Sequence, residues 1–171
     1  GITPLSVAVG NMQTFLPYAS FYRSVQVLDS RRLGKQRVEA FQILNVMDRV
    51  RLDPHGKIAW RNHPAVRMWV GYEEALKLYY NFCVIEWITR GHRNTMLLKP
   101  VVGANLASSY CCTEAPLLED CLPPKTELCL LEKQVIRPPF IGQRAFHVSH
   151  QSNLLRKDEA HYRQHFARVP A

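Results

Sequence analysis

Two long stretches with apolar residues at helical spacing dominate the 171-residue sequence. The first, residues 30–49, predicts a helix whose core-facing stripe consists of Leu33, Ala40, Phe41, Leu44 and Met47. The second, residues 64–90, has a broad apolar surface between Pro64, which suits a first helical turn, and Gly91, which suits a helix end. We expect the two helices to pack together, with the second as the spine of the core.

Shorter segments also favour helices or turns. Ser20 can cap a short helix over residues 21–28, and Asp158 can cap a final helix that reaches Phe166. Residues 143–157 have a helical pattern of their own, and residues 53–56 (Asp-Pro-His-Gly) predict a turn.

Two segments depart from the helical pattern. Residues 12–21 are apolar and aromatic, and Pro17 excludes a helix interior there, so we expect an extended segment packed on the core. Residues 101–136 are irregular and proline-bearing, with short helical or extended pieces expected around residues 117–118 and 128–131.

The whole pattern predicts an all-α fold: a compact helical single domain with long central helices. This domain covers residues 12–171, with 101–136 as an irregular, lineage-specific insert and 1–11 as an N-terminal extension. Residues 1–11 lack the Arg and Ser content of an intact transit peptide. Two origins for them stay open, a cloning remnant or the mature end left after a targeting segment is removed.

The charge distribution favours a polyanionic partner. The formal net charge is +8, and residues 12–100 carry 14 Lys and Arg against 7 Asp and Glu. Residues 137–171 are also basic, whereas residues 101–136 carry 2 basic against 5 acidic residues. One nucleic-acid-binding face built from the two basic parts explains this pattern most simply.

Cysteine spacing and hydropathy disfavour two classes of protein, those with a structural zinc site and those that span a membrane. The five cysteines include no Cys-x-x-Cys pair of the kind that marks a structural zinc site, and a reduced intracellular compartment fits them best. No apolar run is long enough to span a bilayer, so we expect no membrane partner.

The first cluster of candidate site residues lies on the polar side of the predicted helix 30–49. Its members are Arg31, Arg32, Lys35, Gln36, Arg37 and Glu39. One interpretation is a solvated face with a Lys35–Glu39 ion pair at i,i+4 spacing. The other is a functional face in which the cations hold phosphates and Glu39 moves protons.

The second cluster precedes the predicted helix 64–90 and consists of Arg61, Asn62, His63 and Arg67. Donors near a helix N-terminus suit contacts to phosphates or bases. The alternative is structural, with Asn62 capping the helix and His63 packed on Trp60.

The third cluster lies in the predicted helix 143–157 and consists of His147, Ser149, His150, Ser152, Arg156 and Lys157. These donors, with a basic end, favour phosphate binding. His161 and His165 could join His150 in a metal site, but no carboxylate or cysteine is placed to complete the ligands. We therefore expect no metal and no cofactor.

Taken in order, these strings resemble the pyrimidine-dimer DNA glycosylase (endonuclease V-type) family, specifically a bacterial branch that begins MQTFLPY. The resemblance rests on LDSRRLGKQRVEAFQIL, on NHPAV followed by Met68-Trp69, and on FHVSHQSNLLRKDEAHY. It covers most of residues 12–99 and 137–166. It implies a helical fold that binds and kinks DNA at a lesion and flips out a base.

The resemblance also implies a mechanism. In this family a free N-terminal amine attacks the sugar C1′ to form a Schiff base, and a glutamate on the following long helix assists base loss and strand cleavage. Glu39 is the residue that matches this glutamate. The family's chain begins near Met12, which here follows Asn11, so its nitrogen lies in a peptide bond and is not nucleophilic.

Two hypotheses follow for the function. The chain is a DNA glycosylase/AP lyase that needs no cofactor, or it is a catalytically retired protein that binds structured RNA. For the second, an organellar (mitochondrial) ribosome or a similar ribonucleoprotein is a natural host, with a mitochondrial matrix location. A metal-dependent nuclease built on His147, His150, His161 and His165 is the third alternative.

Overall fold

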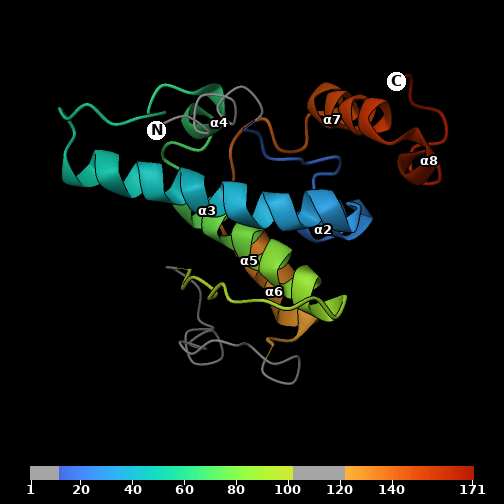
Figure 1. Ribbon diagram of the computed structural model, residues 1–171, viewed down its shortest axis with the longest axis horizontal. Helices are drawn as coiled ribbons and strands as arrows, with labels where there is room; N and C mark the ends of the chain where they lie inside the picture. The colour runs from blue at the N-terminus through green and yellow to red at the C-terminus, as the bar shows by residue number, and fades with distance from the viewer. Residues whose placement is uncertain (1–11, 102–121) are drawn as a thin grey trace, which may run out of the picture.

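The structure, a computed structural model, describes residues 12–101 and 122–171, and within these ranges it contains helices and no strands (Figure 1). The helices are α2 (Phe21–Val27), α3 (Ser30–Leu52), α4 (Pro64–Arg67), α5 (Glu73–Thr89), α6 (Lys125–Gln134), α7 (Arg144–Lys157) and α8 (Glu159–Tyr162). The predicted all-α fold is confirmed. The proposed extension 1–11 and the expected piece at 117–118 lie outside the described residues.

Helices α3 and α5 cross and form the centre of the molecule, as the apolar stripes predicted (Figure 1). Four of the five predicted stripe residues on α3 are buried, and Phe41 is partly buried against the core. Gly34 marks a very close approach of the two helices, because a Cβ at this position would lie 2.8 Å from Trp87 Cζ3. The missing side chain therefore allows the α3 backbone to pack directly on the indole ring.

The prediction of one continuous helix over residues 64–90 is wrong. The segment is divided into α4 and α5 by a turn at residues 68–72, where Tyr72 N–H donates to Trp69 C=O at 2.8 Å. Gly71 has φ +85°, a left-handed conformation that stops a helix. The predicted end at Gly91 is confirmed, since Gly91 also has φ +85° and donates to Ile88 C=O at 2.8 Å.

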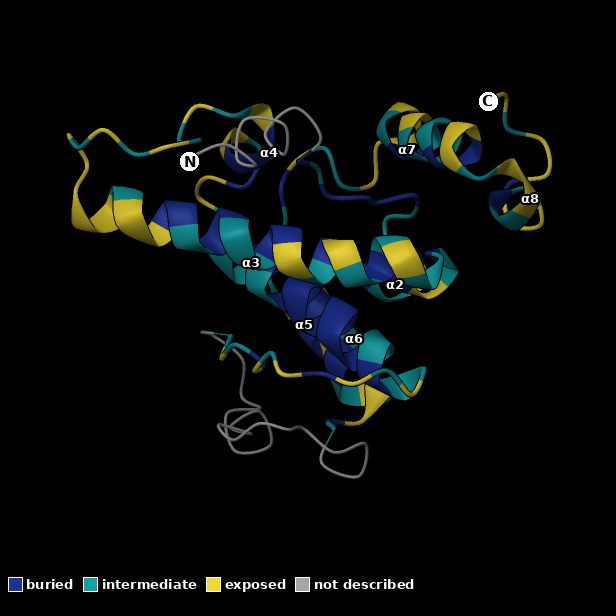
Figure 2. Ribbon diagram, in the orientation of Figure 1, coloured by how far each residue is buried: buried dark blue, intermediate teal, exposed yellow. Residues whose placement is uncertain are grey.

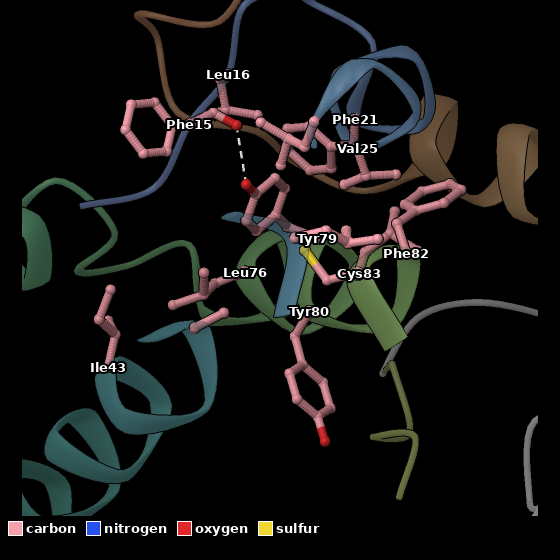
Figure 3. Packing of buried hydrophobic residues seen from close by; sticks show 14 of the residues in the cluster. Phe15, Leu16, Phe21, Val25, Ile43, Leu76, Tyr79, Tyr80, Phe82 and Cys83 are labelled. Carbon is pink, nitrogen blue, oxygen red and sulfur yellow. Dashed lines mark hydrogen bonds between the residues drawn. The ribbon is translucent and has the colours of Figure 1, made fainter. Parts of the chain in front are cut away.

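The core is built around α5, which is buried along most of its length (Figure 2). The Tyr79 ring meets the Phe21 ring edge-on, at 5.7 Å between centroids, and stacks on Trp69 at 6.3 Å. Figure 3 shows that the Tyr79 hydroxyl points away from α5 toward the Phe15 carbonyl, 2.8 Å away. Helix α5 thus reaches the segment that precedes α2.

That segment, residues 12–18, is largely buried, as predicted, and it is extended up to Leu16 before the chain bends at residues 17–19. It pairs with no strand among the residues that the structure describes. Its backbone is instead held by side chains. Gln36 Oε1 accepts from Phe15 N–H and Gln36 Nε2 donates to Gln13 C=O, both at 2.8 Å. Ser24 Oγ accepts from Tyr18 N–H at 3.1 Å and donates to Tyr18 C=O at 3.0 Å.

Helix α7 holds the same segment from the opposite side. His150 Nδ1 accepts from Leu16 N–H at 2.9 Å, and His147 Nδ1 lies 2.8 Å from Leu16 C=O. Gln151 Nε2 donates to Pro17 C=O at 2.7 Å. Side chains from four helices therefore supply the hydrogen bonds that a neighbouring strand would otherwise provide.

Helix α6, which lies within the predicted insert, is part of the core. The expected piece at 128–131 is helical, and its Leu128 and Leu131 are buried. Glu132 accepts from Phe21 N–H at 2.9 Å, and Arg137 links this carboxylate, at 3.0 Å, to Ala19 C=O. Residues 122–137 thus brace the start of α2.

The predicted helix caps are confirmed. Ser20 accepts from Arg23 N–H and Asp158 accepts from His161 N–H, both at 3.1 Å. Helix α8 ends at Tyr162 rather than continuing to Phe166. The Tyr162 hydroxyl donates to the Asp29 carboxylate, which ties α8 to the start of α3.

In the described parts of the chain, each helix is too short or too polar to cross a bilayer.

Replacing Gln36 by Ala tests the side-chain support of residues 12–18. The change leaves Phe15 N–H buried without a partner, at about 1–3 kcal/mol, and Gln13 C=O partly buried without one, at a smaller cost. We expect a loss of roughly 2–4 kcal/mol in the free energy of unfolding, measured by urea denaturation. Gln26→Ala, at an exposed position of α2, is the control and should change stability by less than about 0.5 kcal/mol. Equal stability of the two variants would contradict this account.

Candidate nucleic-acid site

A hollow of about 250 Å³ lies where the N-terminal half of α3 meets residues 12–15 and the end of α7. Its lining residues are Gln13, Phe15, Arg31, Arg32, Lys35, Gln36, Glu39 and Lys157. We call this hollow the Glu39 pocket. Helical spacing places Arg32, Lys35, Gln36 and Glu39 on one face of α3, with Arg31 beside them, whereas Gln13, Phe15 and Lys157 come from segments far away in the sequence.

Glu39 forms the buried wall of the Glu39 pocket and is 6% exposed. Gln36 Nε2 donates to its Oε2 at 2.8 Å, and the Lys35 ammonium lies 3.7 Å from its Oε1. Burial raises the pKa of the Glu39 carboxyl, while Lys35 and hydrogen bonds from the Gln13 backbone and Gln36 oppose this rise. A carboxyl with a raised pKa and access to a cavity is suited to give and take protons.

Gln36 connects this carboxyl to the core. Its Oε1 accepts from Phe15 N–H and lies 2.8 Å from the Tyr79 hydroxyl, so its Nε2 faces both Glu39 and Gln13 C=O. Gln36 is 1% exposed, and its side chain is fixed by partners on every side. The Glu39 carboxylate is therefore oriented by a rigid, buried network.

The lining of the Glu39 pocket contains four cationic side chains and only one carboxylate, that of Glu39. Arg31, Lys35 and Lys157 are exposed, while Arg32 is held at 3.0 Å by the Asp29 carboxylate that caps α3. Burial raises the pKa of Asp29, but hydrogen bonds from Tyr162 and Arg32 outweigh it and hold the pKa below its ordinary value. Asp29 stays charged and fixes the Arg32 guanidinium at the rim. Such a rim attracts phosphate groups.

Within the first predicted cluster, only Arg37 lies away from the Glu39 pocket. Its guanidinium packs over the Trp87 ring at 4.4 Å and donates to Asn94 Oδ1 at 2.7 Å. The Trp87 ring in turn stacks on His92, with 4.1 Å between centroids. This stack joins α3 to the segment that follows α5.

The second predicted cluster is not part of the Glu39 pocket. The alternative in which Asn62 caps the helix is wrong, because the His63 imidazole accepts from Ala65 N–H at 3.0 Å and Asn62 is exposed. Arg61 donates to Gly56 C=O at 2.9 Å, and Arg67 is exposed on α4.

Of the third predicted cluster, Lys157 alone lines the Glu39 pocket. His147 is buried, with Nδ1 on Leu16 and Nε2 accepting from Gly142 N–H at 2.8 Å, so neither ring nitrogen is left for a phosphate. Burial, and to a lesser degree His147, lowers the pKa of His150 to about 4, which keeps its Nδ1 an acceptor for Leu16. Ser149 and Arg156 are exposed on α7, and Ser152 is half-buried.

Among residues 12–101 and 122–171, no group of three or more His, Cys, Asp or Glu side chains could hold a metal ion. Of the histidines considered for a nuclease site, His161 is used elsewhere, with Nε2 2.9 Å from Val27 C=O.

Three residues of the site were not predicted from the sequence: Gln13, Phe15 and Tyr79. Gln13 and Phe15 lie within the string MQTFLPY, with which the family's chain begins. Their place in this string could have indicated that they belong to the site. Tyr79 lies at a core position of the apolar pattern, and nothing local distinguishes its hydroxyl from that of Tyr80.

Comparison with protein families gives a match to the model described as pyrimidine dimer DNA glycosylase, over residues 12–100. The chain belongs to the pyrimidine dimer DNA glycosylase family. Comparisons with curated proteins and with solved structures gave no match. The region that matches this glycosylase family contains every residue of the Glu39 pocket except Lys157.

Replacing Glu39 by Gln should stabilise the protein at neutral pH. Because folding raises the pKa of Glu39, the folded state binds the proton more tightly, and stability falls as the pH rises from the ordinary value of 4.5 through the raised value. Glu39→Gln avoids this loss, so we expect the variant to be more stable than the parent protein at pH 7, by a margin that shrinks near pH 4. Thermal unfolding at both pH values measures it, with the exposed Glu159→Gln as control. A variant less stable than the parent protein at pH 7 would argue against destabilisation of the ionised Glu39 carboxylate by burial.

Proposed function

We propose that this chain binds nucleic acid across the Glu39 pocket and that the pocket serves glycosylase/lyase chemistry on a damaged nucleotide of DNA. The observation that carries the proposal is a buried carboxyl with a raised pKa inside a cation-lined hollow, in a member of the pyrimidine dimer DNA glycosylase family. The cations Arg31, Lys35 and Lys157 would hold backbone phosphates, and Glu39 would face the sugar between them.

In the proposed reaction, a free amine at the start of residues 12–18 attacks C1′ of the damaged nucleotide. The C–N bond to the base breaks, the base leaves with the electron pair and takes up a proton, and the sugar ring opens to give the imine. Glu39 would supply and remove the protons. Its hydrogen bond from the Gln13 backbone supports this assignment, because the residue next to Met12 then lies at the carboxylate.

The peptide bond between Asn11 and Met12 favours a second function. With its nitrogen acylated, Met12 has no lone pair to attack a sugar. The same cationic surface would then serve to hold structured RNA without catalysis. A subunit of a ribonucleoprotein, such as an organellar ribosome, fits this alternative.

Neutralising the exposed cations of the Glu39 pocket tests binding. We expect the triple variant Arg31→Ala, Lys35→Ala and Lys157→Ala to bind duplex DNA more weakly and with a salt slope lower by about one for each lost phosphate contact. Fluorescence anisotropy over a range of salt concentrations measures both quantities. A matched triple variant, Arg93→Ala, Lys133→Ala and Arg168→Ala, removes the same charge at exposed positions outside the pocket. If both variants lose affinity equally, charge alone rather than the pocket governs binding.

Borohydride trapping on abasic DNA tests the chemistry. We expect little trapped adduct with the chain that retains Asn11 before Met12, and more with a chain that begins at Met12, because the latter has a primary amine at the segment's start. In the shorter chain, Glu39→Gln should suppress strand cleavage while largely preserving binding, since the amide keeps the shape and loses the proton transfer.

Two results would overturn parts of this proposal. Strong trapping by the chain that retains Asn11 would assign the nucleophile to another amine. Tight binding without trapping by the chain that begins at Met12 would favour the non-catalytic, RNA-holding function.

A further inference from the structure

A second hollow lies further along the face of α3 that carries Glu39. It has a volume of about 310 Å³ and is lined by Gln42, Asn45, Val46, Arg49, Ala59 and Trp60. Glu39, Gln42, Val46 and Arg49 follow one another at spacings of three, four and three, so they lie in one row along the helix. Arg49 is about 15 Å from Glu39 along the helix axis. We call this hollow the Trp60 pocket.

The Trp60 pocket has the chemistry of a nucleobase site. Trp60 offers an aromatic face, and Val46 and Ala59 add apolar walls. Gln42 and Asn45 each carry a carboxamide, which has both donors and an acceptor for the edge of a base. Arg49 contributes a cation at the distal end, and no carboxylate is among the lining residues. Stacking on an aromatic ring with amide contacts at the base edge is how proteins bind unpaired bases.

The backbone of Trp60 is strained in the conformation that forms this wall. Its φ is +69°, and within residues 12–101 and 122–171 Trp60 is the only residue other than glycine in the left-handed region. Bulky residues rarely adopt this region, and such strain persists only where the surrounding structure enforces it. The enforcing contacts are those of a tight loop, in which His63 N–H donates to Trp60 C=O at 2.8 Å and Arg61 reaches Gly56 C=O.

This loop connects α3 to α4 and folds back over the C-terminal half of α3 (Figure 1). It thereby brings Trp60 to the part of this helix row that lines the pocket, at Gln42, Val46 and Arg49. A glycine would satisfy the loop conformation without strain, but it would leave this side of the hollow without an aromatic wall.

We propose that the Trp60 pocket binds the base of an unpaired nucleotide when nucleic acid lies along α3 with its backbone at the Glu39 pocket. The inference rests on the nucleic-acid binding proposed above. At about 3.4 Å per nucleotide along one strand of a duplex, the 15 Å between the pockets corresponds to about four nucleotides. The two pockets then contact one continuous stretch of nucleic acid, one through phosphates and the other through a base.

A pair of labelled DNA duplexes tests the proposal, one fully paired and one with a single unpaired adenine. Trp60→Gly removes a ring that is partly buried against the core, but it also relieves the strained backbone, which offsets part of the lost packing, so it should keep the fold. We expect this variant to bind the duplex with the unpaired adenine roughly 5- to 150-fold more weakly, the range for one stacked base. Affinity for the paired duplex and its salt slope should not change. Trp60→Phe, which keeps an aromatic ring, should retain most of the preference for the unpaired base.

Two further variants complete the experiment. Asn45→Ala removes an amide from a half-buried position of α3 that lines the Trp60 pocket, without changing the loop, and it should also reduce the preference for the unpaired base. Leu52→Ala shortens a 77% exposed apolar residue at the end of α3 and should change neither affinity.

The outcomes separate this inference from the function on which it rests. If Trp60→Gly keeps the wild-type preference, or loses affinity for both duplexes equally, the base-binding role of the Trp60 pocket is wrong, and binding through the Glu39 pocket is unaffected. If the wild-type protein binds neither duplex, the proposed function fails and this inference fails with it. Selective loss of the preference in Trp60→Gly and Asn45→Ala supports the assignment.

Discussion

The hydrogen bonding of a buried, extended segment governs the rest of this structure. Residues 12–18 enter the core without joining a sheet, so each of their amide and carbonyl groups needs another partner. Side chains of Gln36, Tyr79, His147 and His150 supply most of these partners, from helices α3, α5 and α7. Buried polar groups left unpaired are costly, and the positions of three helices are therefore fixed relative to one another by this one segment.

The need to pair the backbone groups of residues 12–18 also forms the candidate site. Gln36 must hold Gln13 and Phe15, and in doing so it directs its remaining donor capacity to Glu39. Residues 12–15 cover the carboxylate that helical spacing alone would leave on a solvated face, and burial then raises its pKa. The electrostatic character of Glu39 is thus a consequence of core assembly rather than of its immediate neighbours in the sequence.

Features set by local patterns were predictable from the sequence, and features set by distant contacts were not. Leu33 and Ala40 face the core because helical spacing requires it, and Ser20 and Asp158 cap helices because their side chains suit that role. The break after Arg67 was missed because the apolar spacing continues through it, whereas the backbone forms a turn in which Gly71 has φ +85°. The polar neighbours of His147 and His150 favour a phosphate-binding role for both, yet their hydrogen-bond partner Leu16 lies 131 and 134 residues away in the sequence.

The long separation between Leu16 and its histidines has a consequence for the order of assembly during synthesis. Contacts between residues that are distant in the sequence close large loops, and their entropic cost delays them relative to local helices. Helices α2 and α3 can form early, but residues 12–18 have no support from α7 until residues 147–151 have been made. A nascent chain that ends before residue 147 therefore has Glu39 and the cations of α3 without a complete pocket, because neither the histidines that hold Leu16 nor Lys157 has yet been added.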